Sequence, residues 1–439
     1  MARALAVVVV ALLGGCSLVL PTAEFGDPVD GGTDAGADAG LVDAGMMGDA
    51  GRDGGPDAGV DGGAVPDAGE CPGCALICVD GACVDGISDL RAGFGHTCAL
   101  RASGNVVCWG DNREGELGDG TMTPRTTPTI VPVADIASID TSGRPWSCAV
   151  ERAGGVLCWG SNDRGALGTG AESPAVVPMP GPVLGIADAV QVGAGSWHGC
   201  VVRATGAIVC WGFGALGVLG TGDTETRLTP VAVATPTNAD RIAAGGGFNC
   251  ARQTNGSVLC WGGASSGATG QDPSGGNVLV PTAVPGITDA IDVTAGSSHA
   301  CALRPMGLGV LCWGDNAFGQ LGVASPRTRP TPALIPGTEM AVDVDAGNNH
   351  TCAVLEDGDV VCWGDNFEDQ LGAEPLGGVG VVTVPGIPAA VAVASGGAHT
   401  CAALVTGGVM CWGRNMEGQL GSGSTSASEV SPVAVVGLP

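Results

Sequence analysis

The chain has 439 residues, with 44 acidic residues against 17 basic residues that are all arginine, and a formal net charge of −27. This charge repels phosphate, so it argues against a nucleic-acid partner. The 19 cysteines would be vulnerable in a reducing cytosol, and they indicate an oxidising compartment.

Residues 1–15 have the pattern of a secretory signal peptide. Arg3 precedes the apolar run "ALAVVVVALL", which is too short to span a bilayer. The run continues into "LGGC", which resembles a bacterial lipoprotein signal. In that class the cysteine, here Cys16, is lipidated and becomes the mature N-terminus, and Ser17 favours the outer membrane. Without Cys16 an even number of cysteines remains. The alternative is an ordinary signal peptide with an incidental cysteine.

Residues 16–70 consist largely of Gly, Asp and Ala. After Cys16 they contain twelve acidic residues and one arginine. Such a segment cannot bury enough apolar surface to offset its chain entropy, so we expect a disordered linker. The strict Asp-x-Asp-x-Asp-Gly calcium loop is missing, which favours a solvated tether over a calcium site.

Residues 71–86 form a small cysteine-rich module with the sequence "CPGCALICVDGAC" at its start. Its cysteines are Cys71, Cys74, Cys78 and Cys83. In an oxidising compartment their irregular spacing favours two disulfides over a zinc site. All three connectivities remain open.

Residues 87–439 repeat themselves. "CWG" occurs seven times, at steps of 50, 52, 50, 52, 50 and 49 residues. In the first repeat, "HTCALRASGNVVCWG" predicts a β-hairpin that turns at Ser103-Gly104, with Leu100 opposite Val106 and His96 opposite Gly110. The two cysteines then face each other within disulfide distance. The predicted pairs are Cys98 with Cys108, Cys148 with Cys158, Cys200 with Cys210, Cys250 with Cys260, Cys301 with Cys312, Cys352 with Cys362, and Cys401 with Cys411.

Cysteine and tryptophan are adjacent in "CWG", so they point to opposite faces of a sheet. Both faces must therefore be covered, which happens when sheets stack around an axis as blades. We expect the tryptophans to lie between neighbouring blades: Trp109, Trp159, Trp211, Trp261, Trp313, Trp363 and Trp412.

A bulky residue opposes the glycine of each "CWG": His96, Trp146, His198, Phe248, His299, His350 or His399. All five histidines of the chain occupy this position. In a ring they are dispersed, one per blade, and Trp or Phe replaces them in two repeats. We therefore expect a packing role and no metal or catalytic role.

The frame A-G-x-x-H-T-C-A-L followed by G-x-V-x-C-W-G-x-N-x-x-G-Q-L-G resembles the repeat of the regulator of chromosome condensation family. Repeats three and four lack the turn Asn and the Gln of this frame. The resemblance implies an all-β fold, a seven-bladed β-propeller over residues 87–439. The first repeat lacks the preceding "VPG" strand, and the last repeat ends in "SPVAVVGLP", which supplies it. We therefore expect the ring to be closed by N- and C-terminal strands that share one blade.

The family's best-known member is a nuclear guanine nucleotide exchange factor that binds chromatin. Here the uniform repeat spacing leaves no inserted wedge for exchange, and residues 87–439 contain 30 acidic residues against 15 arginines. Catalytic motifs such as Gly-x-Ser-x-Gly, a phosphate loop and His-Glu-x-x-His are absent. We expect no enzyme, no cofactor, no metal and no nucleic-acid partner.

The remaining hypothesis is a monomeric, lipid-anchored propeller that binds an envelope or extracellular protein, on the periplasmic face of the outer membrane or on the cell surface. A passive envelope component and a carbohydrate or peptidoglycan binder are the alternatives. An acidic patch of Glu356–Asp359 with Asp365–Asp369 is a candidate surface for a basic partner or cation, against a plain solvated surface. The sequence does not identify the partner or the binding face.

Overall fold

The computed structural model describes residues 77–79, 82–235, 237–373 and 380–438. A short ladder precedes the repeats, in which β1 (Ile77–Val79) pairs with β2 (Ala82–Val84) and the backbone of Cys78 lies opposite that of Cys83. Cys16, Cys71 and Cys74 lie outside the described residues, as do the predicted signal peptide and linker. The prediction of two disulfides in the cysteine-rich module therefore stays a prediction.

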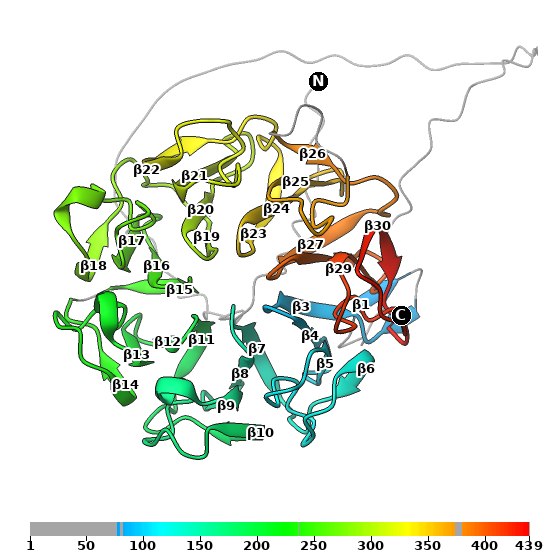
Figure 1. Cartoon of the computed structure of the whole chain (residues 1–439), viewed down its shortest axis with the longest axis horizontal. Helices are drawn as coiled ribbons and strands as arrows, with labels where there is room; N and C mark the ends of the chain where they lie inside the picture. Colours follow the sequence, from blue (N-terminus) through cyan, green and yellow to red (C-terminus); the bar gives the residue numbers. More distant parts are fainter. Residues whose placement is uncertain (1–76, 80–81, 236, 374–379, 439) are drawn as a thin grey trace, which may run out of the picture. The chain divides into compact units, whose positions relative to one another are not determined.

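The repeats form seven four-stranded antiparallel sheets, which are the blades of a ring (Figure 1). Blade 1 consists of β3 (Ile87–Ala92), β4 (His96–Arg101), β5 (Val106–Gly110) and β6 (Arg125–Ile130), and blade 2 of β7 (Ile136–Thr141), β8 (Trp146–Glu151), β9 (Val156–Ser161) and β10 (Val176–Pro182). Blade 3 consists of β11 (Ala189–Ala194), β12 (His198–Arg203), β13 (Ile208–Gly212) and β14 (Arg227–Ala232), and blade 4 of β15 (Ala239–Ala244), β16 (Phe248–Gln253), β17 (Val258–Gly262) and β18 (Val278–Ala283).

Blades 5 to 7 have the same order. Blade 5 consists of β19 (Asp292–Ala295), β20 (His299–Leu303), β21 (Val310–Asp315) and β22 (Thr328–Leu334). Blade 6 consists of β23 (Ala341–Ala346), β24 (His350–Leu355), β25 (Val360–Gly364) and β26 (Val382–Thr383), and blade 7 of β27 (Ala390–Ser395), β28 (His399–Leu404), β29 (Val409–Arg414) and β30 (Ser428–Ala434). Three 3₁₀ turns lie in the loops: η1 (Asp163–Gly165), η2 (Ala215–Gly217) and η3 (Pro273–Gly275). Within the described residues, none of the helices has the length and apolar character that crossing a bilayer requires.

The central hairpin of each blade has the predicted register. In blade 1, Cys98 pairs with Cys108, Leu100 with Val106 and His96 with Gly110. All seven predicted disulfides are present, with Cα atoms 4.0–4.1 Å apart. Such a short distance is typical of directly opposed residues at a non-hydrogen-bonded site. Each disulfide therefore joins the second and third strands of one blade.

The hydrophobic core lies between the blades. Seven clusters of buried apolar side chains occupy the seven interfaces, and each cluster combines residues of two neighbouring blades. The seven "CWG" tryptophans are at most 1% exposed, and each contributes its indole to one interface. Burial of this apolar surface is the main term that holds the blades together.

The ring closes between blades 7 and 1, but it does so differently from our prediction. Each blade is built from one continuous segment, and among the described residues no sheet mixes N- and C-terminal strands. The first blade already has its innermost strand, β3, while "SPVAVV" supplies β30, the outermost strand of blade 7. Closure comes from packing of β3 against β27 and β28. The prediction was wrong because the "VPG" segment is a turn between blades and not a strand: Gly286, Gly337 and Gly386 have positive φ there.

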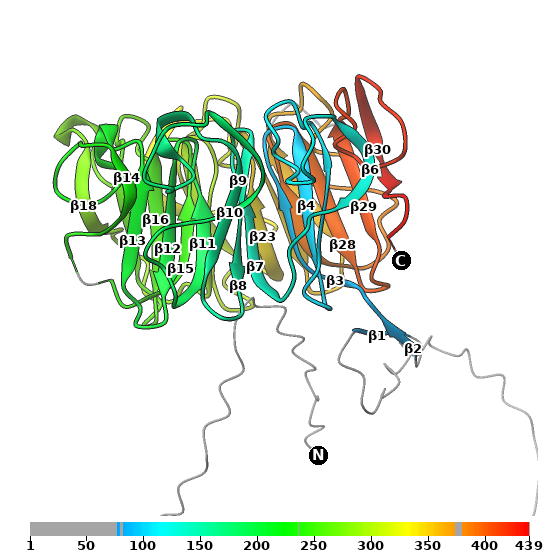
Figure 2. The same cartoon turned by 90° about the horizontal axis from the view of Figure 1, so that it is seen from below.

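The innermost strands line the centre of the ring (Figure 1), where each contacts the innermost strand of the next blade, and the strands run between the two faces of the ring (Figure 2). Side chains of one strand accept hydrogen bonds from backbone N–H groups of the next strand around the ring. The donors and acceptors are Ile139 to Asp89 (3.4 Å), Ala194 to Asp140 (2.6 Å), Ile242 to Gln191 (2.7 Å), Ala346 to Thr294 (3.1 Å), Val393 to Asp343 (2.8 Å) and Ser395 to Asp345 (2.7 Å). These bonds satisfy groups that an exposed strand edge would leave open.

Candidate binding face

Antiparallel order places the loops of every blade on two faces of the ring. The loops from first to second strand and from third to fourth strand lie on one face, which we call the front face. The hairpin turns and the connections between blades lie on the other, the rear face. Hydrogen bonds link front-face loops to one another, such as Phe94 N to Ser142 O (3.1 Å) and Gly397 N to Gly93 O (2.9 Å).

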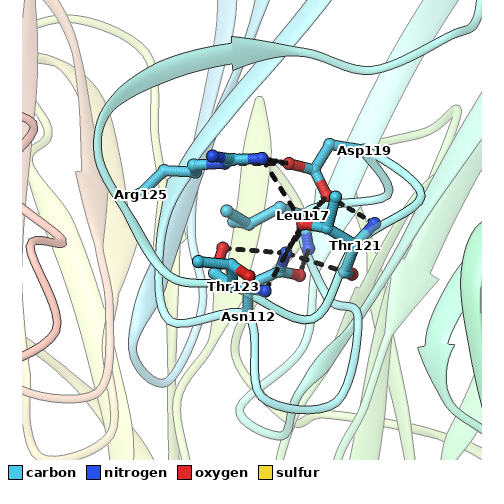
Figure 3. A network of polar contacts seen from close by, with 6 residues as sticks. All are labelled: Asn112, Leu117, Asp119, Thr121, Thr123 and Arg125. Carbon is cyan, nitrogen blue, oxygen red and sulfur yellow. Dashed lines mark hydrogen bonds and ion pairs between the residues drawn. The ribbon is translucent and has the colours of Figure 1, made fainter.

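The long third-to-fourth loop is fixed by its turn asparagine (Figure 3). In blade 1, Asn112 Oδ1 accepts from Leu117 N (3.0 Å), and Asn112 Nδ2 donates to the carbonyl oxygens of Thr121 (3.2 Å) and Thr123 (3.1 Å). The same bond to a leucine N–H recurs at 2.9–3.2 Å for Asn162, Asn316, Asn366 and Asn415. One buried amide thus holds both ends of a loop in place.

Asp119 completes this network in blade 1. Its carboxylate accepts from Thr121 N (2.9 Å) and from the Arg125 guanidinium at 2.8 and 2.9 Å. Partial burial opposes ionisation, but the hydrogen bonds from Thr121 and Arg125 outweigh it and lower the pKa of Asp119. The loop is therefore locked at both its middle and its end.

Blades 3 and 4 lack the turn asparagine, as the sequence indicated, and carry Gly214 and Ala264 instead. In blade 3 the chain itself fills the space, since a Cβ at Gly214 would collide with the carbonyl of Glu225. Gly214 N donates to the Thr226 hydroxyl (3.3 Å). The outer loop of blade 3 is therefore held by a different contact.

Every described aromatic side chain outside the blade interior lies on the front face. Phe94, Phe318 and Phe367 are 54%, 44% and 85% exposed, and Trp197 and Phe213 are half-buried. The nine other aromatic side chains are buried, and the chain has no tyrosine. Exposed apolar groups on rigid loops are typical of interaction surfaces.

Four of the exposed apolar groups occupy consecutive blades. We call Phe318 (blade 5), Phe367 (blade 6), Met416 (blade 7) and Phe94 (blade 1) the apolar sector; Met416 is 57% exposed. Ion pairs connect the long front-face loops of blades 6, 7 and 1: Arg414 lies 4.0 Å from Glu368 and 3.0 Å from Glu417. Arg113 continues the series, 3.8 Å from Glu417 and 3.2 Å from Asp111.

A cleft of about 640 Å³ opens on the front face at blades 1, 2 and 3. Arg144 and Arg164 lie with Trp197 in its lining. The Arg144 guanidinium carbon is 4.3 Å from the centre of the Trp197 ring system. That of Arg164 is 5.8 Å from Trp197 and 4.3 Å from Phe213. Sequence reasoning missed this cleft.

The residues that line the cleft could have been noticed in the sequence, because they differ from the residues at the same positions of the other repeats. The carbonyl oxygen of Trp197 accepts a hydrogen bond from Phe213 N, just as the carbonyl of Gly95 accepts from Asp111 N and that of Gly247 accepts from Gly263 N. The position of Trp197 is thus occupied by small or polar residues in most other blades. Arg144 and Arg164 come from the preceding repeat, so they could be placed beside Trp197 only once the ring was known.

The five histidines have the structural role that the sequence predicted, and they also hydrogen-bond across the blade interfaces. The Nε2 atom of each histidine forms a hydrogen bond with a side-chain oxygen of the next blade. The pairs are His96 with Ser147 (2.8 Å), His198 with Asn249 (3.0 Å), His299 with Thr351 (2.8 Å), His350 with Thr400 (2.9 Å) and His399 with Thr97 (2.8 Å). The hydroxyls of Ser147, Thr400 and Thr97 donate onward to backbone carbonyls, so they accept from an Nε2–H group. Burial lowers the pKa of His96, His198 and His299 to about 4, and that of His350 and His399 to about 3.

The indole N–H groups of the "CWG" tryptophans donate to backbone carbonyls of the front-face loops, and three of these carbonyls also accept from the hydroxyls of Thr97, Ser147 and Thr400. Trp109 Nε1 donates to Gln419 O (2.8 Å) across the closing interface, and Trp159 Nε1 donates to Glu116 O (2.8 Å). The other five bond to Ala166, Val218, Ala268, Gln320 and Gln370 at 2.7–3.0 Å. Each indole therefore joins its blade to the loop of the preceding blade.

The suggested acidic patch of repeat six does not form. Glu356–Asp359 is the rear-face turn between β24 and β25, whereas Asp365–Asp369 begins the front-face loop after β25. A five-residue strand separates them by roughly 16 Å. The two runs are adjacent in sequence but lie at opposite ends of a strand.

Carboxylates instead gather at the centre of the ring. Burial raises the pKa of Asp140 and Asp343 to about 7, and it also raises the pKa of Asp89 and Asp345. Arg91 lies 3.1 Å from Asp89 and offsets part of this charge. No group of three or more His, Cys, Asp or Glu side chains in the described part of the chain is arranged to hold a metal ion.

Fold and loops together define a β-propeller of seven repeats whose front face is suited to binding other molecules. Models of the regulator of chromosome condensation (RCC1) repeat match the chain at residues 87–116, 290–320, 341–370 and 390–419, and at 153–202, 205–252, 255–303 and 309–354. Together these matches cover more than half of the chain, so the protein belongs to the regulator of chromosome condensation repeat family.

Known relatives agree with this fold. The ultraviolet-B receptor UVR8 of Arabidopsis thaliana is 31% identical over 292 residues, which are 65% of this chain and 54% of that receptor. The chain thus spans about half the length of this curated relative. Prp20p from Saccharomyces cerevisiae has a TM-score of 0.65 at 22% identity, with 78% of this chain and 86% of that chain covered. Human WBSCR16 has a TM-score of 0.64 at 21% identity, with 73% and 86% covered.

Propellers of this family are protein-interaction folds. The Prp20p structure was described together with its binding to Gsp1p and histones, and yeast RCC1 (Prp20) was crystallised with Kap60 bound. Those partners belong to the yeast protein. At these identities the likeness shows a shared fold and nothing about the partner of the present chain.

Proposed function

We propose that this protein is a non-enzymatic interaction platform that binds another protein through the front face of its propeller. The observation that carries the proposal is the segregation of aromatic side chains: every one in the described part of the chain is either inside the blades or on this one face. Turn asparagines fix the front-face loops of Phe318 and Phe367, so these two side chains would be presented with little loss of conformational freedom on binding.

Electrostatics supports a partner with a basic surface. The propeller segment has twice as many acidic residues as arginines, 30 against 15. The apolar sector lies among carboxylates such as Asp365, Glu368 and Glu417. A partner with exposed apolar anchors and surrounding Lys or Arg side chains would complement both features.

The front face can be tested by capture from envelope extracts with the tagged full-length protein in mild detergent. Phe318→Ser combined with Phe367→Ser should reduce the captured partner at least about fivefold, because exposed aromatic anchors dominate binding energy. Ile130→Ser combined with Met179→Ser is the matched control, since these side chains are 72% and 52% exposed on the outermost strands β6 and β10. Equal capture by both variants would contradict the front face as the site. A reproducible lack of any captured protein would favour the passive envelope component.

The proposal includes an anchor in the bacterial outer membrane through lipid on Cys16. It is supported by the "LGGC" motif after a short apolar run and by the abundance of cysteine. Cys16→Ser should move the protein from the membrane fraction to the soluble fraction. Cys71→Ser is a control that should leave fractionation unchanged. A Cys16→Ser protein that stays in the membrane, with no lipid on the wild-type N-terminus by mass spectrometry, would refute the anchor.

A further inference from the structure

The cleft at blades 1 to 3 is lined by residues that differ from those at the same positions of the other repeats. The first-to-second loop of blade 2 (Ser142–Pro145) is one residue longer than its counterparts, and the extra residue brings Arg144. Blade 3 contributes Trp197, and Arg164 stands where blades 1, 6 and 7 have Glu114, Glu368 and Glu417. Packing of the ring does not require these residues, because the other blades are built without them.

The aromatic rings hold the two guanidinium groups in place. Arg144 lies over Trp197 at 4.3 Å, Arg164 lies over Phe213 at 4.3 Å, and the two rings meet edge-to-face at 6.2 Å and 75°. A guanidinium that stacks on a ring keeps its in-plane N–H groups available as donors. The stack therefore orients these donors without using them.

Carboxylates of the protein leave these donors largely open. Twelve of the fifteen described arginines have a carboxylate within 4.0 Å, and Arg144, Arg327 and Arg329 have none among the described residues. Arg164 is one of the twelve, but it reaches only the exposed Asp163, at 3.9 Å. By contrast, Arg203 lies 2.7 Å from Asp188 and Arg304 lies 2.7 Å from Asp289. In a strongly acidic protein, two arginines without a close partner are available to an external anion.

The cleft also has negative groups in its lining. Glu114, Asp163 and Glu172 come from the loops of blades 1 and 2. With two arginines, the lining has a formal charge of −1, so a ligand that is only an anion would be opposed. A ligand with both a carboxylate and an ammonium group would complement both signs.

We propose that this cleft binds a zwitterionic ligand, with its carboxylate held by Arg144 and Arg164, its apolar part against Trp197, and its ammonium group toward the acidic lining. A free amino acid and a short peptide with free termini share this chemistry. The volume of about 640 Å³ falls within the range of roughly 300–1,000 Å³ usual for ligand sites. This inference goes beyond the protein platform, because the lining of the cleft includes none of the four side chains of the apolar sector.

Calorimetric titration of the purified full-length protein tests the proposal with defined probes. L-phenylalanine, the tripeptide Ala-Ala-Phe, its C-terminal amide and its N-acetyl form separate the free amino acid from the peptide and the two charges from each other. We expect saturable binding of the amino acid or the tripeptide, and a loss of at least about tenfold in affinity for the amide and for the N-acetyl form. If neither unmodified probe binds, or if amidation has no effect, the proposal is wrong.

Variants locate the binding. Arg144→Gln combined with Arg164→Gln should weaken the binding of the unmodified probe at least about tenfold, and folding should be retained because both side chains are exposed. Arg152→Gln is the matched control, since Arg152 is an exposed rear-face arginine of the same blade. Trp197 is the one described tryptophan that is not buried, so a ligand-induced change in fluorescence should vanish in Trp197→Phe. Unchanged affinity in the double arginine variant would overturn the assignment of the site. The outcome is independent of partner capture, because no envelope protein is present.

Discussion

At the scale of single residues, the residue type opposite each "CWG" glycine correlates with a residue of the next blade. Where a histidine lies opposite the glycine, the residue directly before the first cysteine of the next blade is polar and forms a hydrogen bond with it: Ser147, Asn249, Thr351, Thr400 or Thr97. Where Trp146 or Phe248, which have no imidazole, lies opposite the glycine, the residue before the first cysteine of the next blade is Gly199 or Ala300. The sequence analysis predicted packing over glycine but not this pairing, because the partners lie 50–52 residues apart in four pairs and 302 residues apart for His399 and Thr97.

Glu116 shows how one atom changes the electrostatics of an otherwise repeated site. Gln320, Gln370 and Gln419 occupy the same position in blades 5, 6 and 7, and their Oε1 accepts a backbone N–H, as Glu116 does from Glu114 N (2.9 Å). Burial raises the pKa of Glu116 to about 7, and the nearby Asp111 adds to this effect. Because the folded pKa lies above the ordinary value of 4.5, the folded state binds more protons than the unfolded state between these values. The contribution of Glu116 to stability is therefore lost as the pH rises toward and through 7.

We expect Glu116→Gln to stabilise the protein at pH 8 by roughly 1–3 kcal/mol, and by much less at pH 5, because the amide stays neutral. Unfolding in denaturant at the two pH values measures the difference. The reciprocal change, Gln320→Glu, should destabilise blade 5 more at pH 8 than at pH 5. A Glu116→Gln effect that is the same at both pH values would show that the ionisation of Glu116 does not contribute.

At the scale of the blade, sequence reasoning succeeded where contacts are local. The hairpin register, the seven disulfides and the burial of the tryptophans follow from residues within about a dozen positions of one another. It failed at the fourth strand, where proline and register shifts weaken the alternating pattern; β6 (Arg125–Ile130), for example, pairs irregularly with β5. Assigning "VPG" as a strand moved the blade boundary and produced the wrong closure.

The candidate site was predicted less well than the fold, for a related reason. The acidic patch was proposed from adjacency in sequence, but the strand between its two halves places them on different faces. The cleft with Arg144, Arg164 and Trp197 is assembled from loops of three repeats. Its residues are distinctive one by one, but only the ring brings them together.

At the scale of the whole molecule, the ring makes all seven interfaces equivalent, including the one that joins the two ends of the described propeller. Trp109 bonds to Gln419 across that closing interface as every other "CWG" tryptophan bonds to the preceding blade. The disulfides play a different part. Each is buried and confined to one blade, so the disulfides stabilise the blades while apolar packing and indole hydrogen bonds hold the blades to one another.

This division of roles predicts the effect of removing one disulfide. Cys98→Ala combined with Cys108→Ala opens a loop of about eleven residues, which the chain-entropy model values at about 3 kcal/mol. Because the interfaces remain, we expect a single calorimetric transition at a midpoint a few degrees lower, with the ring intact. The same double replacement at Cys301 and Cys312 should have a similar effect, since that disulfide is equally buried. Peptide mapping of the unreduced wild-type protein should find these linkages only within single repeats. A bond between cysteines of two different repeats would contradict both the hairpin register and the location of the tryptophans between the blades.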